Sequence, residues 1–265
     1  MSEVPVRPAD LGEARLRYWV QGARPQTLML IISPMLAGVA YAYALAGRIA
    51  VLPVLAAFVS ALLIQVATNL ANDAADGAKG RDGAGRLGPP RITGSGLMSP
   101  AEMQAGAVFA SLGALLFGLV CVWSGGWPII SIGIASLAAG WLYSYGPKPI
   151  SATPLGEVFV TLFFGIIATA GMVWLAAGLV DAAALLVGLA IGLPAAAVLT
   201  VNNHRDRHQD RLNGRRTLAI LIGEMWTRRL YAALLLLAPC CAALALLPVS
   251  SLGALAVLAL LPVAV

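Results

Sequence analysis

The sequence predicts an all-α fold, a polytopic membrane helix bundle in which two four-helix repeats surround a central cavity. Three observations predict it. Of the 265 residues, 60% are hydrophobic and only 11% are charged, whereas a soluble domain has roughly 25% charged residues. The apolar residues form long runs, and two short acidic stretches end runs that are four helices apart. With a mean hydropathy of +0.86, the chain is predicted to be an integral membrane protein.

Eight apolar runs come close to the ~20 residues that an α-helix needs to cross the ~30 Å hydrocarbon core. They cover residues 27–46, 49–70, 101–123, 127–145, 154–178, 183–201, 230–248 and 251–265. The last run would span only about two thirds of the core, which leaves open a ninth helix missing from its C-terminal side. The chain is therefore divided into an N-terminal segment, 1–26, and a transmembrane domain, 27–265.

Local signals support these boundaries. The N-terminal segment begins with a polar stretch of mixed charge that extends to Arg17. Because it lacks the basic start and the small-residue cleavage site of a signal peptide, we expect a cytoplasmic segment on or near the membrane. Ser99, Pro100 and Glu102 have the spacing of a capping box with proline at the first helical position, which predicts the start of the third helix.

Basic residues predict the orientation. Sixteen of the 17 Lys and Arg residues lie before the first helix or after the second, fourth and sixth helices, and Arg48 lies on the other side. By the positive-inside rule these loops face the cytoplasm. As a separate expectation, the protein is placed in a prokaryotic inner membrane. Juxtamembrane arginine also attracts anionic lipid. The pI of about 9.4 therefore requires no nucleic acid.

Two acidic motifs, 69–82 and 202–210, follow the second and sixth helices. In each motif an asparagine precedes an aspartate by four residues, and another aspartate follows three or four residues later. At about 100° per residue, each set falls on one helix face. Clustered carboxylates repel one another unless a cation joins them. Internal repeats of membrane proteins place sites at the interface between the halves, so both motifs are predicted to face one central cavity.

A glycine-rich basic loop follows each motif. Residues 77–96 contain seven glycines and four basic residues, and Gly214 is followed by Arg215 and Arg216. Such loops suit phosphate, because glycine lets backbone N–H groups approach an anion and Lys or Arg supplies charge. A solvated loop with positive-inside bias is the alternative. Two carboxylate sets beside phosphate predict Mg²⁺, which shares its ligands with substrate phosphates.

Other polar residues in the apolar regions give weaker indications. His204 and His208 point about 200° away from the aspartate stripe of their motif, which argues against a zinc site. Glu157 could reach the cavity or cap its helix. The three cysteines lie within apolar runs without metal-ligand spacing, and we interpret them as structural thiols.

Several of these motifs together resemble those of the UbiA-type intramembrane aromatic prenyltransferases, and most closely the menaquinone-pathway branch. The resemblance covers residues from about 24 to 223. It is carried by the following residues: Asn72, Asp73, Asp76, Gly80 and Asp82; Gly88, Pro89 and Arg91; Tyr143, Tyr145, Gly146 and Pro147; Leu155, Gly156 and Glu157; Asn202, Asn203, Arg205, Asp206 and Asp210; Gly214 to Leu218. Members of the family usually have nine helices, whereas this chain supplies about eight.

The resemblance implies a mechanism and a set of site residues. Mg²⁺ between the motifs holds a polyprenyl diphosphate, whose ionisation gives an allylic cation that alkylates an electron-rich aromatic ring. The metal ligands it implies are Asp73, Asp76, Asp206 and Asp210, with Asp82 as a further acidic position. Substrate contacts are expected from Lys79, Arg91, Lys148, Arg215 and Arg216 on the diphosphate, from Arg24 on the diphosphate or the acceptor carboxylate, and from Asn69, Asn72 and Asn202. Tyr143 and Tyr145 could stabilise the cation or form an interfacial belt.

In the menaquinone branch the partners are polyprenyl diphosphate, 1,4-dihydroxy-2-naphthoate and the lipid around the bundle. Prenyl transfer then releases diphosphate and CO₂ and gives demethylmenaquinone. Alternatives remain open: a family member acting on 4-hydroxybenzoate or homogentisate, a transporter with repeated halves, or a membrane diphosphatase or lipid-phosphate transferase. The sequence does not predict tail length, the catalytic base or the oligomeric state.

Overall fold

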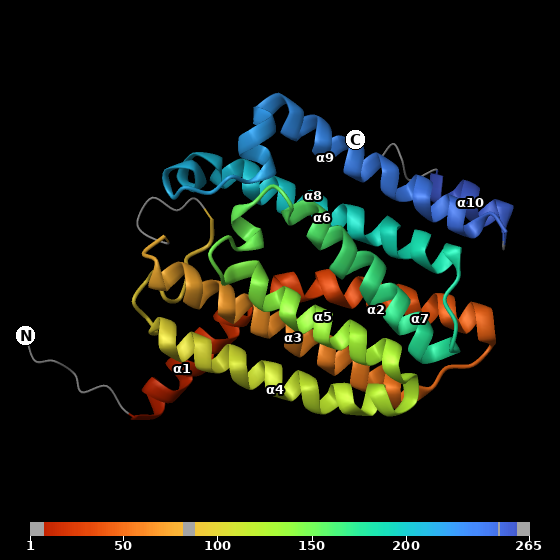
Figure 1. Cartoon of the computed structure of the whole chain (residues 1–265), viewed down its shortest axis with the longest axis horizontal. Coiled ribbons are helices and arrows are strands. Elements are labelled where there is room, and N and C mark those ends of the chain that lie inside the picture. Colours follow the sequence, from red (N-terminus) through yellow and green to blue (C-terminus); the bar gives the residue numbers. More distant parts are fainter. Residues whose placement is uncertain (1–7, 82–87, 249, 259–265) are drawn as a thin grey trace, which may run out of the picture.

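The computed structural model describes residues 8–81, 88–248 and 250–258, and these residues contain helices and no strand. The chain forms an elongated bundle of long helices that run back and forth along one axis (Figure 1). Asp82 lies outside the described residues. In chain order the elements are α1 (Pro8–Ala23), α2 (Pro25–Ala46), α3 (Val51–Ala78), α4 (Pro100–Gly125), α5 (Trp127–Ser144), η1 (Ile150–Ala152), α6 (Gly156–Thr161), η2 (Leu162–Ile167), α7 (Ala168–Ala177), α8 (Ala182–Leu212), α9 (Leu218–Leu246) and α10 (Ser251–Leu258).

The predicted membrane helices are confirmed for the first seven runs. In the described part of the chain, seven stretches are long and apolar enough to cross a membrane, the fifth of them composed of α6, η2 and α7. The eighth run contributes α10, which is too short to cross. Helix α4 begins with the expected capping box between Ser99 and Glu102, with Pro100 as its first residue.

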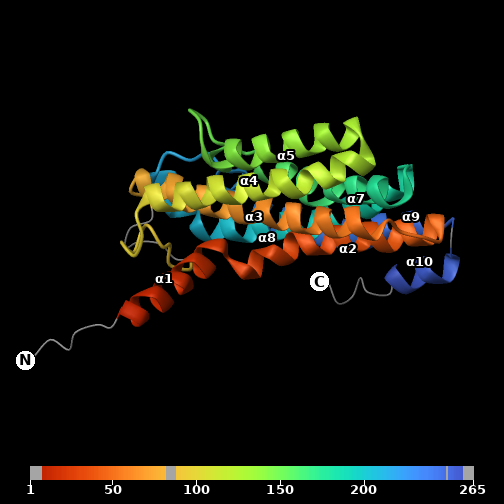
Figure 2. The same cartoon turned by 90° about the horizontal axis from the view of Figure 1, so that it is seen from below.

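The helices pack as two groups joined at the centre. Helix α3 contacts α2, α4 and α5, whereas α8 contacts α6, η2, α7 and α9, and α9 contacts α10. Contacts of α2 with α7 and α8 join the groups. This agrees with the predicted four-helix halves. Helix α1 extends away from the bundle (Figure 2), and the chain turns into α2 at Arg24, a left-handed residue with φ 54°.

The described aspartates of both acidic motifs lie on helices rather than in loops. Helix α3 continues as far as Ala78 and α8 as far as Leu212, so each carries its motif in its last turns. The buried carboxylates of these turns are stabilised by partners from other elements, described below. Each motif therefore presents its side chains on a rigid support, which fixes them relative to one another across the cavity.

The second group is held together by close backbone contact at a π-helical turn, η2 (Leu162–Ile167). A Cβ built on Gly165 would lie 2.4 Å from the carbonyl oxygen of Gly188, and one on Gly192 would lie 2.5 Å from that of Thr161. These distances are too short for any side chain, and the obstacle is backbone. Glycine at these positions therefore lets α8 pack directly on the wall of the cavity.

Replacing Gly192 with alanine is expected to destabilise the protein by about 1–3 kcal/mol, the usual cost of overpacking. The matched control is Gly133→Ala on α5, where a Cβ would meet no atom within 4 Å and the better helix propensity of alanine favours stability. Thermal unfolding in detergent, followed by circular dichroism, compares the two. Equal melting temperatures for both variants would contradict the packing role of Gly192.

Candidate active site

A cavity of about 1080 Å³ lies between the two groups of helices, with walls from α2, α3, α4, α5, α7 and α8. One end is polar and is lined by residues of both acidic motifs. The opposite end is aliphatic, with Met35, Ile129 and Leu175 among its lining residues. The cavity therefore joins a charged chamber to an apolar one, an arrangement suited to an amphipathic ligand.

The motif on α3 presents Asp76 to cations from two loops. Asp76 is 4% exposed, and its Oδ1 accepts hydrogen bonds from Arg215 at 2.6 Å and from Arg81 at 3.5 Å. Asn72 donates to its Oδ2 at 3.4 Å. A carboxylate this deeply buried is costly unless it is paired and hydrogen-bonded. Asp76 is thus stabilised by the basic loops that follow both motifs.

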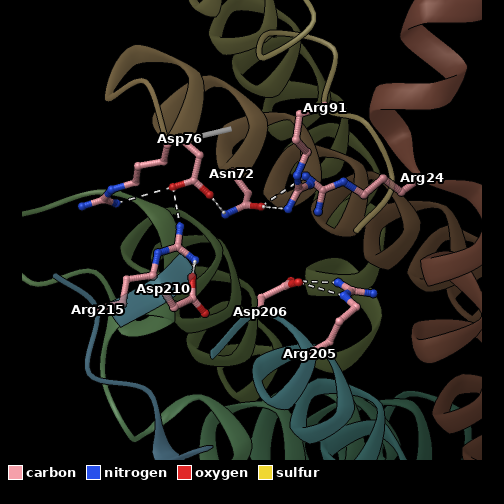
Figure 3. A network of polar contacts seen from close by, with 9 residues as sticks. Arg24, Asn72, Asp76, Arg91, Arg205, Asp206, Asp210 and Arg215 are labelled. Atoms are coloured by element: carbon pink, nitrogen blue, oxygen red, sulfur yellow. Dashed lines mark hydrogen bonds and ion pairs between the residues drawn. The ribbon is translucent and has the colours of Figure 1, made fainter. Parts of the chain in front are cut away.

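Arg215 joins the two motifs (Figure 3). Besides Asp76 on α3, it forms an ion pair of 3.4 Å with Asp210 on α8. Burial by itself lowers the pKa of Arg215, but the two carboxylates outweigh burial and leave that pKa above its ordinary value. The buried Nε of Arg215 has no hydrogen-bond partner. Arg215 and Asp210 line the polar end of the cavity, and Arg215 links Asp210 to Asp76, which does not line it.

Asp206 lies on the same α8 face and has its own arginine. Its two oxygens accept bonds of 2.8 Å from Nε and Nη2 of Arg205, a bidentate pair. Both residues line the cavity. Within the described ranges, no three His, Cys, Asp or Glu side chains gather closely enough to hold a metal ion by themselves. Three carboxylates of the site instead pair with arginines: Asp76 and Asp210 share Arg215, and Asp206 pairs with Arg205.

The side-chain amide of Asn72 binds two more arginines that line the cavity. Its Oδ1 accepts from Arg91 at 3.0 Å and from Arg24 at 3.2 Å, and all three residues line the cavity. Asn69, one turn earlier, donates to the carbonyl of Ala23 at 2.8 Å and to Thr27 Oγ1 at 2.9 Å. These bonds hold the turn between α1 and α2 against α3, and with it Arg24.

Asp73 has a different set of partners. Its oxygens accept hydrogen bonds from the backbone N–H groups of Ile92 and Thr93, at 3.2 and 3.1 Å, and from the Thr93 hydroxyl. Asp73 is 1% exposed. In this structure its carboxylate anchors the loop that carries Arg91. Its role as a metal ligand remains a prediction.

The two tyrosines are separated by the fold. Tyr143, Phe159 and Phe163 line the cavity. The ring centroids of Tyr143 and Phe159 are 5.6 Å apart, and those of Phe159 and Phe163 are 4.6 Å apart. Tyr145 packs on Trp141 at 5.3 Å within a separate hydrophobic cluster. It is absent from the cavity lining. Phe164 lines the cavity as well, so its aromatic wall is formed by Tyr143 and three phenylalanines, which sequence reasoning did not single out.

Three predicted diphosphate contacts also lie away from the cavity: Lys79, Lys148 and Arg216 are exposed and line no part of it. Conversely, Arg81, Arg205 and Asn203 line it and were not predicted as site residues. The sequence feature that could have identified these three residues is their position within or beside the acidic motifs. Asn202 lines the cavity as expected.

Glu157 does not line the cavity but supports its wall. It is 4% exposed and accepts a hydrogen bond of 2.9 Å from Asn203 Nδ2. Because Nδ2 of Asn203 is directed to Glu157, the amide has a fixed orientation on the α8 wall. Glu157 takes neither of the two roles left open for it: it does not line the cavity and does not cap α6 with its side chain, and it contacts the cavity wall through Asn203.

Comparisons with known proteins agree with this architecture. The UbiA prenyltransferase family model matches residues 31–265. Two structures of a UbiA homologue from Archaeoglobus fulgidus superpose with TM-scores of 0.71 and 0.72 at 14% identity, covering 92–93% of this chain and 84–85% of theirs. One is bound to DMAPP and Mg²⁺, the other to GPP and Mg²⁺. At this identity they bear on the fold alone.

A membrane helix bundle with paired acidic motifs at the polar end of an apolar cavity defines an intramembrane prenyltransferase, and this chain belongs to the UbiA prenyltransferase family. Curated 1,4-dihydroxy-2-naphthoate octaprenyltransferases are similar to it over most of its length. Identity is 36% with the Mycobacterium leprae protein (84% of this chain, 75% of the relative), 37% with the Mycobacterium tuberculosis protein (85% and 76%) and 34% with the Escherichia coli protein (87% and 77%).

Proposed function

We propose that the protein transfers a polyprenyl group from polyprenyl diphosphate to 1,4-dihydroxy-2-naphthoate in a Mg²⁺-dependent reaction. Diphosphate and CO₂ are released and demethylmenaquinone is formed. The observation that carries the proposal is the bridge from Asp76 through Arg215 to Asp210, in which Arg215 and Asp210 line the polar end of an otherwise apolar cavity. The acceptor is inferred from the names of the relatives.

The donor set fits Mg²⁺ held together with a diphosphate. Mg²⁺ prefers oxygen ligands and is usually bound through one or two carboxylates plus substrate phosphates, so it needs no three-carboxylate cluster. Asp76 and Asp210 pair with the same guanidinium, that of Arg215, and Asp206 lies on the same face of α8, so carboxylates of both motifs are available as ligands beside the donor's phosphates. When bound, Mg²⁺ would neutralise charge on the leaving diphosphate.

The chain's own cations then bind the donor. Arg24, Arg91, Arg81, Arg205 and Arg215 line the polar end, and guanidinium groups pair with phosphate oxygens bidentately. In a site that excludes water, fixed charges of this kind stabilise the negative charge that develops as the C–O bond breaks.

The aromatic wall protects the reacting carbon. The aromatic side chains of Tyr143, Phe159 and Phe163 line the cavity. Tyr143 stands in the last turn of α5, and Arg24 and Arg215 line the same cavity. Ring faces attract cations, and an apolar wall keeps water from quenching an allylic cation.

The polar end is proposed to face the cytoplasm of a prokaryotic cell. The loops after α3, α5 and α8, which carry the basic residues, lie at the same end of the bundle (Figure 1). The positive-inside rule gives this orientation. Membrane-impermeant thiol labelling of Lys148→Cys in spheroplasts is expected to require permeabilised membranes, and labelling of intact spheroplasts would reverse the topology.

The direct test is incubation of purified protein with Mg²⁺, a polyprenyl diphosphate and an acceptor panel of 1,4-dihydroxy-2-naphthoate, 4-hydroxybenzoate and homogentisate. The expected product is prenylated naphthoquinol lacking the carboxyl mass, together with inorganic diphosphate, and EDTA abolishes it. A product on either other acceptor would reassign the substrate. Release of inorganic phosphate without a prenylated ring would favour a phosphatase.

Replacing Arg205 with alanine is expected to lower kcat/KM for the donor by roughly tenfold, the loss of one or two charge-assisted contacts. Arg207→Ala is the matched control, because Arg207 pairs with Glu224 instead, at 3.4 Å, and does not line the cavity. Initial rates measured against donor concentration give kcat/KM for each variant. Equal losses in the two variants would contradict the assignment of Arg205 to the donor site.

A further inference from the structure

Gln65 continues the polar face of α3 from the acidic motif toward the aliphatic end of the cavity. Gln65, Asn69, Asn72 and Asp76 are separated by four, three and four residues, so they share one face of the helix. Gln65 is buried, lines the cavity and lies two turns from Asn72, about 10 Å at ~1.5 Å per residue. The lining residues of α3 beyond it include Ile64, Ala61 and Ala57. Gln65 therefore stands where the polar lining of α3 becomes aliphatic.

Hydrogen bonds fix the orientation of the Gln65 amide. Asn69 Nδ2 donates to the carbonyl oxygen of Ala23 at 2.8 Å, so Asn69 Oδ1 is left to accept. The Thr27 hydroxyl donates to the carbonyl oxygen of Arg24 at 2.9 Å and is likewise left to accept. Gln65 Nε2 donates to both, at 3.4 Å each. Gln65 Oε1 then accepts no hydrogen bond from the residues that the structure describes.

Several polar groups nearer the acidic motifs are already committed. The arginines that line the polar end can only donate hydrogen bonds. Asn72 Oδ1 accepts from two of them, and both oxygens of Asp206 accept from Arg205. A hydroxyl group of a ligand needs an acceptor, because an unpaired donor in a buried site is costly. Gln65 Oε1 is an uncharged acceptor that the surrounding protein has left available.

The acceptor of the proposed function carries one hydroxyl that needs such a partner. In 1,4-dihydroxy-2-naphthoate the C1 hydroxyl is adjacent to the carboxylate and donates to it within the molecule. The C4 hydroxyl lies on the other side of the same ring and has no internal partner. Because the arginines hold the diphosphate at the polar end, the ring that attacks the prenyl carbon lies on their aliphatic side. Gln65 lines the cavity at this depth.

We propose that Gln65 Oε1 accepts a hydrogen bond from the C4 hydroxyl of the acceptor and so selects a 1,4-dihydroxy ring over a ring that lacks this hydroxyl. The proposal rests on the proposed function and deepens it, because it assigns a residue that selects the acceptor. Thr27 and Asn69 hold the amide in place before the ring binds. An analogue without the hydroxyl leaves Oε1 unpaired, and a site of this kind rejects the analogue for that reason.

The test compares two naphthoates that differ only in the C4 hydroxyl, 1,4-dihydroxy-2-naphthoate and 1-hydroxy-2-naphthoate. Isothermal titration calorimetry of the purified protein with Mg²⁺ and inorganic diphosphate gives a dissociation constant for each naphthoate without turnover, and anaerobic buffer keeps the dihydroxy compound reduced. The unaltered protein is expected to bind the dihydroxy compound roughly tenfold more tightly, the scale of one hydrogen bond. Gln65→Met keeps the length of the side chain without its acceptor and should reduce this preference to within about twofold.

Two further variants separate the oxygen of Gln65 from its other contacts. Gln65→Glu keeps an oxygen acceptor but loses the N–H donors, and it should retain the preference for the dihydroxy compound. Thr68→Val is the matched control, because Thr68 also lines the cavity but donates its hydroxyl to the carbonyl oxygen of Ile64, at 2.9 Å. It should retain the preference as well. Loss of the preference in Gln65→Glu would assign it to the Nε2 contacts and overturn the proposal.

Three other results would also overturn the assignment of Gln65 while prenylation of 1,4-dihydroxy-2-naphthoate by the unaltered protein upholds the proposed function. These are equal affinities of the unaltered protein for the two naphthoates, an undiminished preference in Gln65→Met, and loss of the preference in Tyr143→Phe instead, which would assign the hydroxyl to Tyr143. If the unaltered protein neither binds nor prenylates 1,4-dihydroxy-2-naphthoate, that result contradicts the proposed function, and the assignment of Gln65 with it.

Discussion

Replacing Asp76 with alanine is expected to abolish prenyl transfer, lowering kcat by roughly 10³-fold, the scale at which electrostatic stabilisation of a transition state is lost. The buried carboxylate is the point at which both basic loops meet, through Arg215 at 2.6 Å and Arg81 at 3.5 Å. Its removal takes one oxygen ligand from the proposed metal site. It also leaves Arg215 with Asp210 as its remaining carboxylate partner.

A readout without turnover separates metal binding from simple misfolding. Ligands that bind the native state raise its stability, so Mg²⁺ with inorganic diphosphate is expected to raise the melting temperature of the unaltered protein and not that of Asp76→Ala. Asp76→Asn keeps the volume and a hydrogen-bond acceptor for Arg215 but lacks the charge. Near-normal turnover in either variant would contradict the metal-site assignment.

Asp73→Ala is expected to lower the free energy of unfolding by about 3–5 kcal/mol, more than Asp76→Ala does. The substitution leaves the N–H groups of Ile92 and Thr93 without their acceptor, and each unsatisfied buried group costs about 1–3 kcal/mol. Prenyl transfer should also fall sharply, because the loop that carries Arg91 loses its anchor. Thermal unfolding and limited proteolysis at residues 88–96 measure the release of the loop.

The two possible roles of Asp73 predict different responses to metal. If Asp73 only anchors the loop, Mg²⁺ with inorganic diphosphate still raises the melting temperature of Asp73→Ala. We expect this result, because both carboxylate oxygens of Asp73 accept hydrogen bonds from the loop. As a metal ligand, it would lose that increase as Asp76→Ala does. Thr93→Val is the graded control, since it removes only the hydroxyl bond to Asp73 and should cost about 1 kcal/mol.

The helices and the grouping of the motifs were predictable because they depend on local properties. Apolar runs of membrane-spanning length give the helices, and the recurrence of an asparagine four residues before an aspartate, at Asn69 and again at Asn202, gives the two-fold organisation. The capping box at Ser99 is likewise encoded within four residues. Hydrocarbon supplies no partners for the backbone, so a long apolar run has few alternatives to a helix.

The partners of each polar side chain were not predictable in the same way. Asp73 and Asp76 are three residues apart in one motif, yet one binds the 91–96 loop and the other binds Arg215 of the second half. Tyr143 and Tyr145 are two residues apart, and only Tyr143 lines the cavity. Residue spacing gives the direction of a side chain around its own helix but does not say which distant element lies there.

By itself, therefore, the sequence determined a membrane helix bundle with two acidic motifs, their basic loops and the family resemblance that the comparisons confirm. The tertiary structure alone decided that Arg215 bridges the halves and that Arg205 rather than Lys148 or Arg216 reaches the cavity. Helix formation and burial depend on hydropathy within one segment. Ion pairs and cavities depend on how segments more than 100 residues apart pack, as for Asp76 and Arg215.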